Sequence, residues 1–448
     1  MTSQISARGE SFAQTQQLQR SLGLSGAIVL GVGSTLGGAI FALSGIAVGD
    51  AGPGVLLSFA LALIATIFIA LPYVELACCF PQAGGVYAFV RQTLGERWGF
   101  IVGWIYVTSY IGVAAYVGLG FGNYLHALSN LPPIVGALAL FTAVTVFNLC
   151  GGRLLDRLLK IIVLLTLVSL LAFSLGGLPH LDHRFLTPVF PHGLGGVMNA
   201  APIAFLALSG FDVLAAAGEE VQHPQRTLPL AIFSTLAIVF GLYVLVCITI
   251  TGVLPAAFLA TSPAPLASAA ALIFGEPGRW LIACAALLAN AARGNAVLVA
   301  SSRATFAMAR DGLFPRFLAQ TSARGIPYAA IVLNGALFLV IVLFGSITWA
   351  ALFANTLYAL QFFFAFAALL VLRRRQGGQP PVFRTPALAF ILPLAVASCL
   401  CMLLAGGMPA VGIACLWLGI GWIFATLAHK AATWQKWRQT QKARSVLS

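Results

Sequence analysis

A cluster of glycines interrupts the first long apolar segment of the chain, which runs from Leu22 to Val48. The cluster reads Gly33-Ser34-Thr35-Leu36-Gly37-Gly38. Each glycine weakens a helix by about 1 kcal/mol, and irregular backbone at membrane depth survives only where it lines a cavity or is buried in protein. The segment therefore predicts a broken helix with free backbone groups near the bilayer centre, an arrangement by which secondary transporters hold substrates.

The composition indicates a membrane protein along almost the whole length. Of 448 residues, 60% are hydrophobic and only 8% are charged, whereas soluble domains are roughly 25% charged. Apolar runs of about 20 residues recur, and breaks between them predict twelve membrane-spanning helices. Residues 1–21 lack an apolar core followed by a cleavage site, so we expect an uncleaved first span. The eight cysteines have no metal-ligand spacing and are interpreted as reduced packing residues, and we expect neither cofactor nor metal.

The basic residues are distributed as the positive-inside rule requires. With the N-terminus in the cytoplasm, every Lys and Arg lies on the cytoplasmic side except Arg184, Arg279 and Arg293. The sequence therefore predicts both termini in the cytoplasm of a multi-pass protein of the inner or plasma membrane. The net charge of +13 is then explained by anchoring beside an anionic leaflet, and not by binding of nucleic acid.

The sixth span is also interrupted, around Ala207-Leu208-Ser209-Gly210-Phe211-Asp212. Five helices separate the first and sixth spans, which therefore enter the membrane from opposite sides. This is the pattern of a five-plus-five inverted repeat in an all-α membrane protein. The predicted organisation is a cytoplasmic segment (1–21), a first repeat (22–178), a second repeat (198–372), helices 11 and 12 (387–428) and a basic tail (429–448).

The two interruptions predict a receptor made from main chain. Backbone N–H groups between Ser34 and Ala39 would attract a carboxylate, and carbonyls between Ala207 and Ser209 would accept from an ammonium group. Phe205 and Phe211 flank the second break, where they would either gate it or simply pack. The alternative for the glycines is close helix packing in small-xxx-small motifs.

Arg293 is the most costly residue to place in the membrane. It lies roughly 20 Å from either end of its span, at 1.5 Å per residue, so its side chain cannot easily reach water. One interpretation is a fixed cation in the transport pathway, which binds an anionic group of the substrate or replaces a coupling ion. The other is a structural ion pair with Asp212 or Glu75.

Several other polar residues are candidates for coupling. Asp212 follows the second break, where it would take up a proton, pair with Arg293 or cap the next half-helix. Ser301 and Ser302 lie further along the eighth span and are also candidates. Glu219 and Glu220 are interpreted as a hydrated face.

The chain resembles the amino acid–polyamine–organocation transporters, close to permeases of the cationic-amino-acid-transporter type. The resemblance covers residues 22 to about 430 and rests on motifs that occur in the expected order. They read GVGSTLGGAIFALSG, FPQAGGVYAFVRQTLGERWGFIVGW, FLALSGFDVLAAAGEEVQHPQRTLP, SSRATFAMARDGLFPRF and VLRRRQGGQPPVFRTP. It implies the leucine-transporter fold and alternating access. The matching motifs assign the substrate carboxylate to Ser34, Thr35, Gly37 and Gly38 and its amino group to Ala207, Leu208 and Ser209, with Phe205 and Phe211 nearby.

The chain departs from the family pattern at three positions. Ala39 stands where a glycine is usual. Val163 stands where many relatives carry a lysine that mimics a bound sodium. Arg293 lies one helical turn from Val297, the substrate-facing position of the eighth span.

We therefore expect a transporter of α-amino acids, with neutral or acidic side chains because of Arg293, which works by proton symport or exchange. The alternatives are a carrier of another organic amine or anion, and an amino-acid-sensing receptor that does not transport. No enzyme motif occurs at a plausible spacing. The expected partners are the lipid bilayer, the substrate and a proton or exchanged solute, and the oligomeric state stays open.

Overall fold

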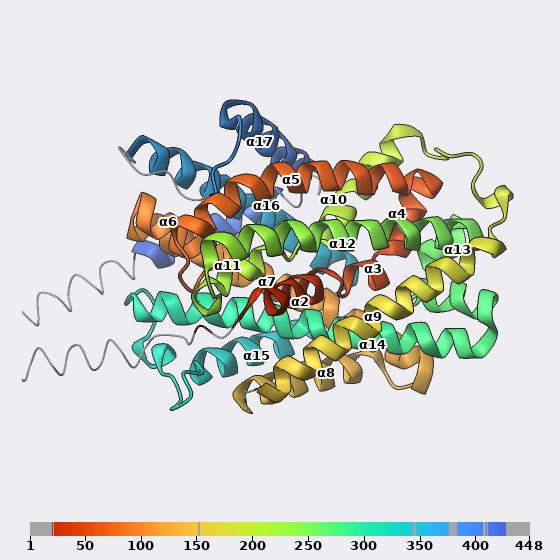
Figure 1. The fold of residues 1–448 in the computed structure, drawn as a ribbon, viewed down its shortest axis with the longest axis horizontal. Helices are drawn as coiled ribbons and strands as arrows, with labels where there is room; N and C mark the ends of the chain where they lie inside the picture. Colours follow the sequence, from red (N-terminus) through yellow and green to blue (C-terminus); the bar gives the residue numbers. More distant parts are fainter. Residues whose placement is uncertain are drawn as a thin grey trace, which may run out of the picture.

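The computed structural model describes residues 20, 22–150, 153–343, 346–375, 383–405, 409 and 411–426, and in these ranges the regular elements are all helices (Figure 1). The predicted terminal segments 1–21 and 429–448 lie outside the described residues, except for Arg20. The α-helices of the first half are α2 (Leu24–Thr35), α3 (Ala39–Ala42), α4 (Ser44–Ala51), α5 (Val55–Cys79), α6 (Val86–Leu94), α7 (Glu96–Ser129), α8 (Pro133–Cys150) and α9 (Arg153–Gly177). Those of the second half are α10 (Gly193–Leu208), α11 (Asp212–Ala216), α12 (Pro224–Val253), α13 (Ala256–Thr261), α14 (Pro265–Arg310), α15 (Tyr328–Val342), α16 (Ile347–Arg375) and α17 (Leu388–Ala405).

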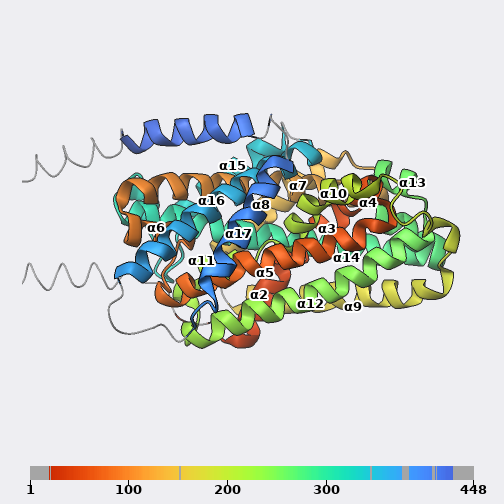
Figure 2. The same ribbon diagram turned by 90° about the horizontal axis from the view of Figure 1, so that it is seen from above.

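Nine stretches of the described residues are helical, long and apolar enough to cross a membrane. Three shorter apolar helices accompany them, at Tyr328–Val342, Leu388–Leu404 and Val411–Thr426. The long helices run along the same axis of the molecule in two perpendicular views (Figures 1 and 2). The chain is thus built as a multi-pass membrane protein.

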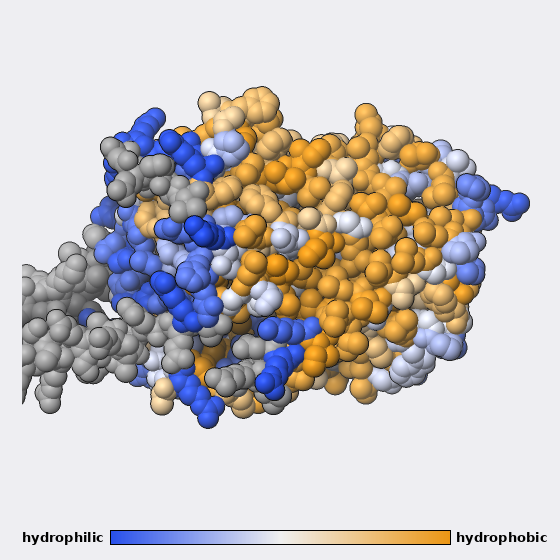
Figure 3. Space-filling model, in the orientation of Figure 1, coloured by the Kyte–Doolittle hydropathy of each residue, from blue (hydrophilic) through white to orange (hydrophobic). Residues whose placement is uncertain are grey.

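The surface fits this interpretation. An apolar belt covers the middle of the face shown in Figure 3, and hydrophilic residues gather at the two ends. Large aliphatic and aromatic side chains are exposed on the helices, among them Leu164 at 61%, Leu272 at 63% and Phe390 at 68%. Such a wide apolar surface is unfavourable in water and matches the hydrocarbon of a bilayer.

The first and sixth spans are each divided into two pieces. α2 ends at Thr35 and α3 begins at Ala39, and between them Gly38 has φ 7° and ψ −49°, outside the helical region. α10 ends at Leu208 and α11 begins at Asp212, with extended backbone at Ser209 and a φ of 124° at Gly210. The second break requires glycine because this left-handed φ is unfavourable for residues with a Cβ.

The long helices α7 and α14 pack against each other and against the broken spans. α14 contacts α2, α3 and α11, and α7 contacts α3. α14 carries a kink at Gly275, where φ is 69°, so the predicted eighth span (279–310) is the part of α14 after the kink. Arg293 projects from that part, which positions it beside both breaks.

Candidate functional site

The two helix breaks touch each other through Ser34. Its hydroxyl lies 2.8 Å from the carbonyl oxygen of Gly210, in the second break, and 2.7 Å from that of Gly31 in its own helix. Tyr243 of α12 donates to the carbonyl of Thr35 at 2.8 Å. The ends of α2 and α10 are therefore held side by side in the protein interior, where Ser34 and Ser209 are fully buried.

Backbone groups remain unpaired at both breaks. In the described part of the chain, the N–H groups of Gly37, Gly38 and Ala39 find no acceptor. Nor do the carbonyl oxygens of Ala207 and Leu208 receive a hydrogen bond from another described residue. Buried backbone groups are almost always paired, so these groups offer hydrogen-bonding capacity for a ligand, donors on one side and acceptors on the other.

Arg293 reaches from α14 to the second break. Its Nη1 donates to the carbonyl oxygen of Ser209 at 2.8 Å, and Nη2 donates to the hydroxyl of the same residue at 3.1 Å. Nη2 also lies 3.4 Å from the hydroxyl of Tyr116 on α7. The guanidinium therefore binds part of the main chain that the sequence assigns to the substrate amino group.

The glycines of both breaks leave room for this side chain. A Cβ on Gly37 would lie 1.9 Å from Cβ of Arg293, and a Cβ on Gly210 would lie 2.3 Å from its Nη1. Contacts below 3.0 Å do not occur for real Cβ atoms. The side chain of Arg293 thus runs from the first break to the second and fits closely between them.

The interpretation of Arg293 as half of a structural ion pair is wrong. Among the described residues no carboxylate forms a salt bridge with it. Glu75 instead accepts from Arg373 at 2.7 and 2.9 Å and from the N–H of Thr385 at 2.7 Å. These distances place Glu75 in a different network. The hydrogen-bond acceptors that Arg293 has among the described residues are neutral, and its charge also acts on the carboxylate of Asp212 without a salt bridge.

Asp212 lies in an aromatic cluster. Its Oδ2 accepts from the hydroxyl of Tyr110 at 2.7 Å, and Oδ1 has no hydrogen-bond partner among the described residues. The N-cap residue of α11 is Phe211 and Asp212 is the first residue of the helix, so the predicted capping of α11 by Asp212 is wrong. Tyr110 is in turn 3.3 Å from the hydroxyl of Tyr106 and makes an edge contact with the ring of Tyr358. A fully buried carboxylate with a free oxygen is costly, which marks Asp212 as a functional candidate.

The remaining predicted residues are buried but only partly connected to this centre. Phe211 stacks on Phe362 with centroids 5.9 Å apart, and it meets Tyr73 edge-on. Phe205 and Val297 are fully buried, and Ala39 is 3% exposed. Ser301 and Ser302 donate to carbonyls of their own helix, at Leu298 and Val299. These hydrogen bonds stay within α14 and do not reach either break, so among the described residues no hydrogen bond supports the predicted role of the two serines in coupling.

The tyrosines around the breaks were not singled out in the sequence. Tyr110 and Tyr116 lie in α7 and contact Asp212 and Arg293, and Tyr243 in α12 binds Thr35. The available signal was a phenol in the middle of an apolar span, because a buried Tyr hydroxyl usually finds a polar partner.

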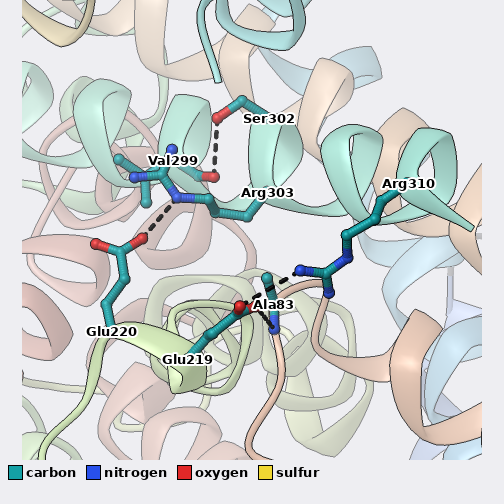
Figure 4. A network of polar contacts seen from close by, with 7 residues as sticks. All are labelled: Ala83, Glu219, Glu220, Val299, Ser302, Arg303 and Arg310. Atoms are coloured by element: carbon teal, nitrogen blue, oxygen red, sulfur yellow. Dashed lines mark hydrogen bonds and ion pairs between the residues drawn. The ribbon is translucent and has the colours of Figure 1, made fainter. Parts of the chain in front are cut away.

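A second polar network closes one end of the bundle, and the interpretation of Glu219 and Glu220 as a hydrated face is wrong (Figure 4). Glu220 pairs with Arg303 at 2.6 Å. Glu219 accepts from Arg310 at 3.3 Å and from the N–H of Ala83 at 3.0 Å. The four charged side chains are only 13–23% exposed. We call these five residues the charged network; it joins the end of α14 to the segment after α11 and to the turn before α6.

Two further contacts strengthen the same end. Leu22 pairs with the segment after α11 through two backbone hydrogen bonds, from its N–H to Glu220 O and from Gln222 N–H to its own carbonyl. Tyr87 donates to Asp311 at 2.7 Å, and Arg91 pairs with the same carboxylate at 3.1 Å. Burial and the charge of Asp311 raise the pKa of the Tyr87 phenol well above its ordinary value, so Tyr87 remains a donor.

Comparison with known proteins agrees with these features. Residues 22–428 match the model of the amino acid permease family. A branched-chain amino acid permease of Bacillus subtilis is 31% identical, over 91% of this chain and 92% of its own length. The human cationic amino acid transporter 4 is 31% identical over 81% of this chain and 61% of its own length, and a methylthioribose transporter of Bacillus subtilis is 28% identical over 87% and 88%. The chain therefore belongs to the amino acid permeases of the amino acid–polyamine–organocation superfamily, as its motifs indicate.

Proposed function

We propose that this protein is a secondary transporter that moves amino acids across the inner or plasma membrane by alternating access. The observation that carries the proposal is the contact of the two helix breaks through Ser34 and Gly210. Beside it lie donors at Gly37 to Ala39 and acceptors at Ala207 and Leu208 that find no partner among the described residues. A carboxylate and an ammonium group of one small molecule complement these two sets.

The proposed architecture is the leucine-transporter fold, with twelve spans, an inverted repeat over 22–178 and 198–372, and both termini in the cytoplasm. The matching positions of the breaks in the first and sixth spans support the repeat. The two arginines of the charged network, Arg303 and Arg310, support a cytoplasmic location for that end of the bundle.

In this proposal the charged network is the cytoplasmic gate. Its ion pairs and the backbone pairing of Leu22 connect the end of α14 with the segments that adjoin α2 and α11. Release of substrate to the cytoplasm would require these contacts to separate. The pairs are partly buried, so their stability is sufficient to hold a closed state and small enough to be broken in each cycle.

The driving force is either a proton gradient or exchange with a second solute. Asp212 is the proposed proton acceptor, because it is fully buried, follows the second break directly and has one oxygen without a hydrogen-bond partner among the described residues. A Cβ added to Gly33 would lie 3.0 Å from a methyl group of Val163, so Val163 faces the first span. An apolar side chain therefore occupies the position where a lysine would carry a coupling charge.

Counterflow in proteoliposomes tests the function. The purified protein is reconstituted with an unlabelled amino acid inside, and uptake of the labelled amino acid is followed for a panel that also includes methylthioribose, which one relative transports by name. Exchange of at least one amino acid is expected. Binding of an amino acid without any exchange would contradict transport and favour a sensor.

The coupling is tested in the same vesicles. An imposed pH gradient, acidic outside, should accelerate net uptake by the wild type and not by Asp212→Asn. If the gradient has no effect and uptake requires an amino acid inside the vesicles, the protein works by exchange and not by proton symport.

A further inference from the structure

Arg293 does more than place a positive charge between the two breaks, because it binds one particular residue of the second break. It binds both oxygens of Ser209, the carbonyl at 2.8 Å and the hydroxyl at 3.1 Å. The stem of its side chain packs on Gly37. Ser209 is one of the three residues assigned to the amino group of a substrate, so the protein itself places a cation at that part of the site.

The guanidinium retains free hydrogen-bonding capacity. It carries five N–H donors and cannot lose its charge. Three hydrogen bonds are made within the described residues, to the two oxygens of Ser209 and to Tyr116. Two N–H donors of a side chain that is 2% exposed therefore have no described acceptor. A carboxylate is the group that such planar donors bind best.

The positive charge of Arg293 determines which charged groups of a substrate the site binds. Among the described residues no carboxylate forms a salt bridge with Arg293. The charge of Arg293 acts on Asp212, but the hydrogen bond of Asp212 Oδ2 is made by Tyr110 and not by the guanidinium. A substrate carboxylate would supply a counter-charge bonded directly to the guanidinium. An ammonium group at the carbonyls of Ala207 or Leu208 would share the second break with the guanidinium that binds Ser209, so like-charge repulsion reduces what the ammonium group contributes to binding.

We propose that Arg293 supplies the positive charge at the second break, so that the site recognises small monocarboxylates and does not require an α-amino group in its substrate. The 2-oxo and 2-hydroxy acids that correspond to apolar amino acids belong to this class. The inference rests on the proposed function, since it concerns the same site, and it adds a substrate class that an amine-binding site would exclude.

The test uses matched sets of three compounds on the purified full-length protein. The sets are L-leucine, L-phenylalanine and L-alanine, each with its 2-oxo acid and its decarboxylated amine. Thermal stabilisation gives apparent affinities, and counterflow reports transport. In the wild type we expect the best 2-oxo acid to bind within about threefold of its amino acid, and the amines not to bind.

Variants of Arg293 separate charge from packing. Arg293→Gln should weaken binding of the 2-oxo acid by about tenfold or more, equivalent to about 1.4 kcal/mol, and should weaken binding of the amino acid less because Ser209 becomes free for its ammonium group. Arg293→Lys keeps the charge and should retain binding of the 2-oxo acid. Arg279→Gln, at a side chain 40% exposed, is the control. The wild-type comparison remains decisive if Arg293→Gln does not fold.

The outcomes distinguish the two proposals. If the wild type binds an amino acid about tenfold or more tightly than its 2-oxo acid, the role of Arg293 is overturned and amino acid transport stands. If the panel is neither bound nor exchanged, the proposed function is overturned, and this inference with it.

Discussion

Gly37 and Arg293 are in direct contact across the first break, with the position of a Cβ on Gly37 only 1.9 Å from Cβ of Arg293 and 3.1 Å from the carbonyl oxygen of Ala289. Neither neighbour can move aside easily, because a Cβ and a carbonyl are fixed to the backbone of α14. The glycine is therefore required by the close approach of α14 to the break.

Gly37→Ala should destabilise the protein by about 1–3 kcal/mol or more, the usual cost of overpacking a tight interior. It should also abolish transport, because the break must separate from Arg293 to relieve the overlap. Apparent melting temperature and counterflow measure the two effects. The control is Gly195→Ala in α10, where no atom of the described residues lies within 4 Å of the added Cβ. Equal stability of the two variants would contradict the contact.

The breaks themselves were predictable from the sequence, and their partners were not. Glycines within an apolar run are visible in a sequence, and so is the distance of Arg293 from the ends of its span. Its acceptor is the main chain of Ser209, and a main-chain acceptor carries no sequence signature. The sequence offered Asp212 and Glu75 as partners because only side-chain charges can be seen there.

The charged network illustrates the same limit. Glu219 and Glu220 lie beside a His-Pro turn, which is typical of a solvated end of a helix. Their partners Arg310 and Arg303 are 91 and 83 residues away in the sequence, and the pairing depends on how α14 packs. A single sequence does not encode such long-range pairing in any local pattern.

Ser34→Ala removes the hydrogen bond that connects the two breaks. The carbonyl of Gly210 would keep only its hydrogen bond from the N–H of Val213 at 3.1 Å, so the variant loses one net hydrogen bond, worth about 0.5–1.5 kcal/mol. Transport should slow by more than stability alone explains, because the relative position of the breaks also changes. The matched control is Ser398→Ala in α17, where the hydroxyl bonds to the carbonyl of Leu394 within its own helix. A loss of stability and transport no larger than in this control would contradict the role of Ser34.

Exchange of the charges in the proposed gate tests the pair formed by Glu220 and Arg303. Glu220→Arg and Arg303→Glu each replace an attractive pair, 2.6 Å apart in the structure, by two like charges, so each should impair transport. The double variant restores an ion pair and should recover much of the activity. A double-mutant cycle on transport rates should give a coupling energy of about 0.5–3 kcal/mol. Additive losses would show that the two residues act independently.

Glu75→Gln tests a buried ion pair that anchors α17 and has no hydrogen bond to either break among the described residues. Glu75 is 1% exposed and accepts hydrogen bonds from Arg373 and from the N–H of Thr385, so it connects the ends of α5 and α16 to the segment before α17. Removal of one partner of a buried pair leaves an uncompensated charge and costs about 3–5 kcal/mol. The apparent melting temperature in detergent should therefore fall markedly.

The control for this variant is Glu276→Gln, whose pair with Arg279 is exposed at 68% and 40% and should contribute at most about 1 kcal/mol. Because Glu75 does not contact either break among the described residues, the folded fraction of Glu75→Gln should bind substrate with the affinity of the wild type. A selective loss of substrate affinity with unchanged stability would place Glu75 in the binding site and would contradict its assignment as an anchor of α17.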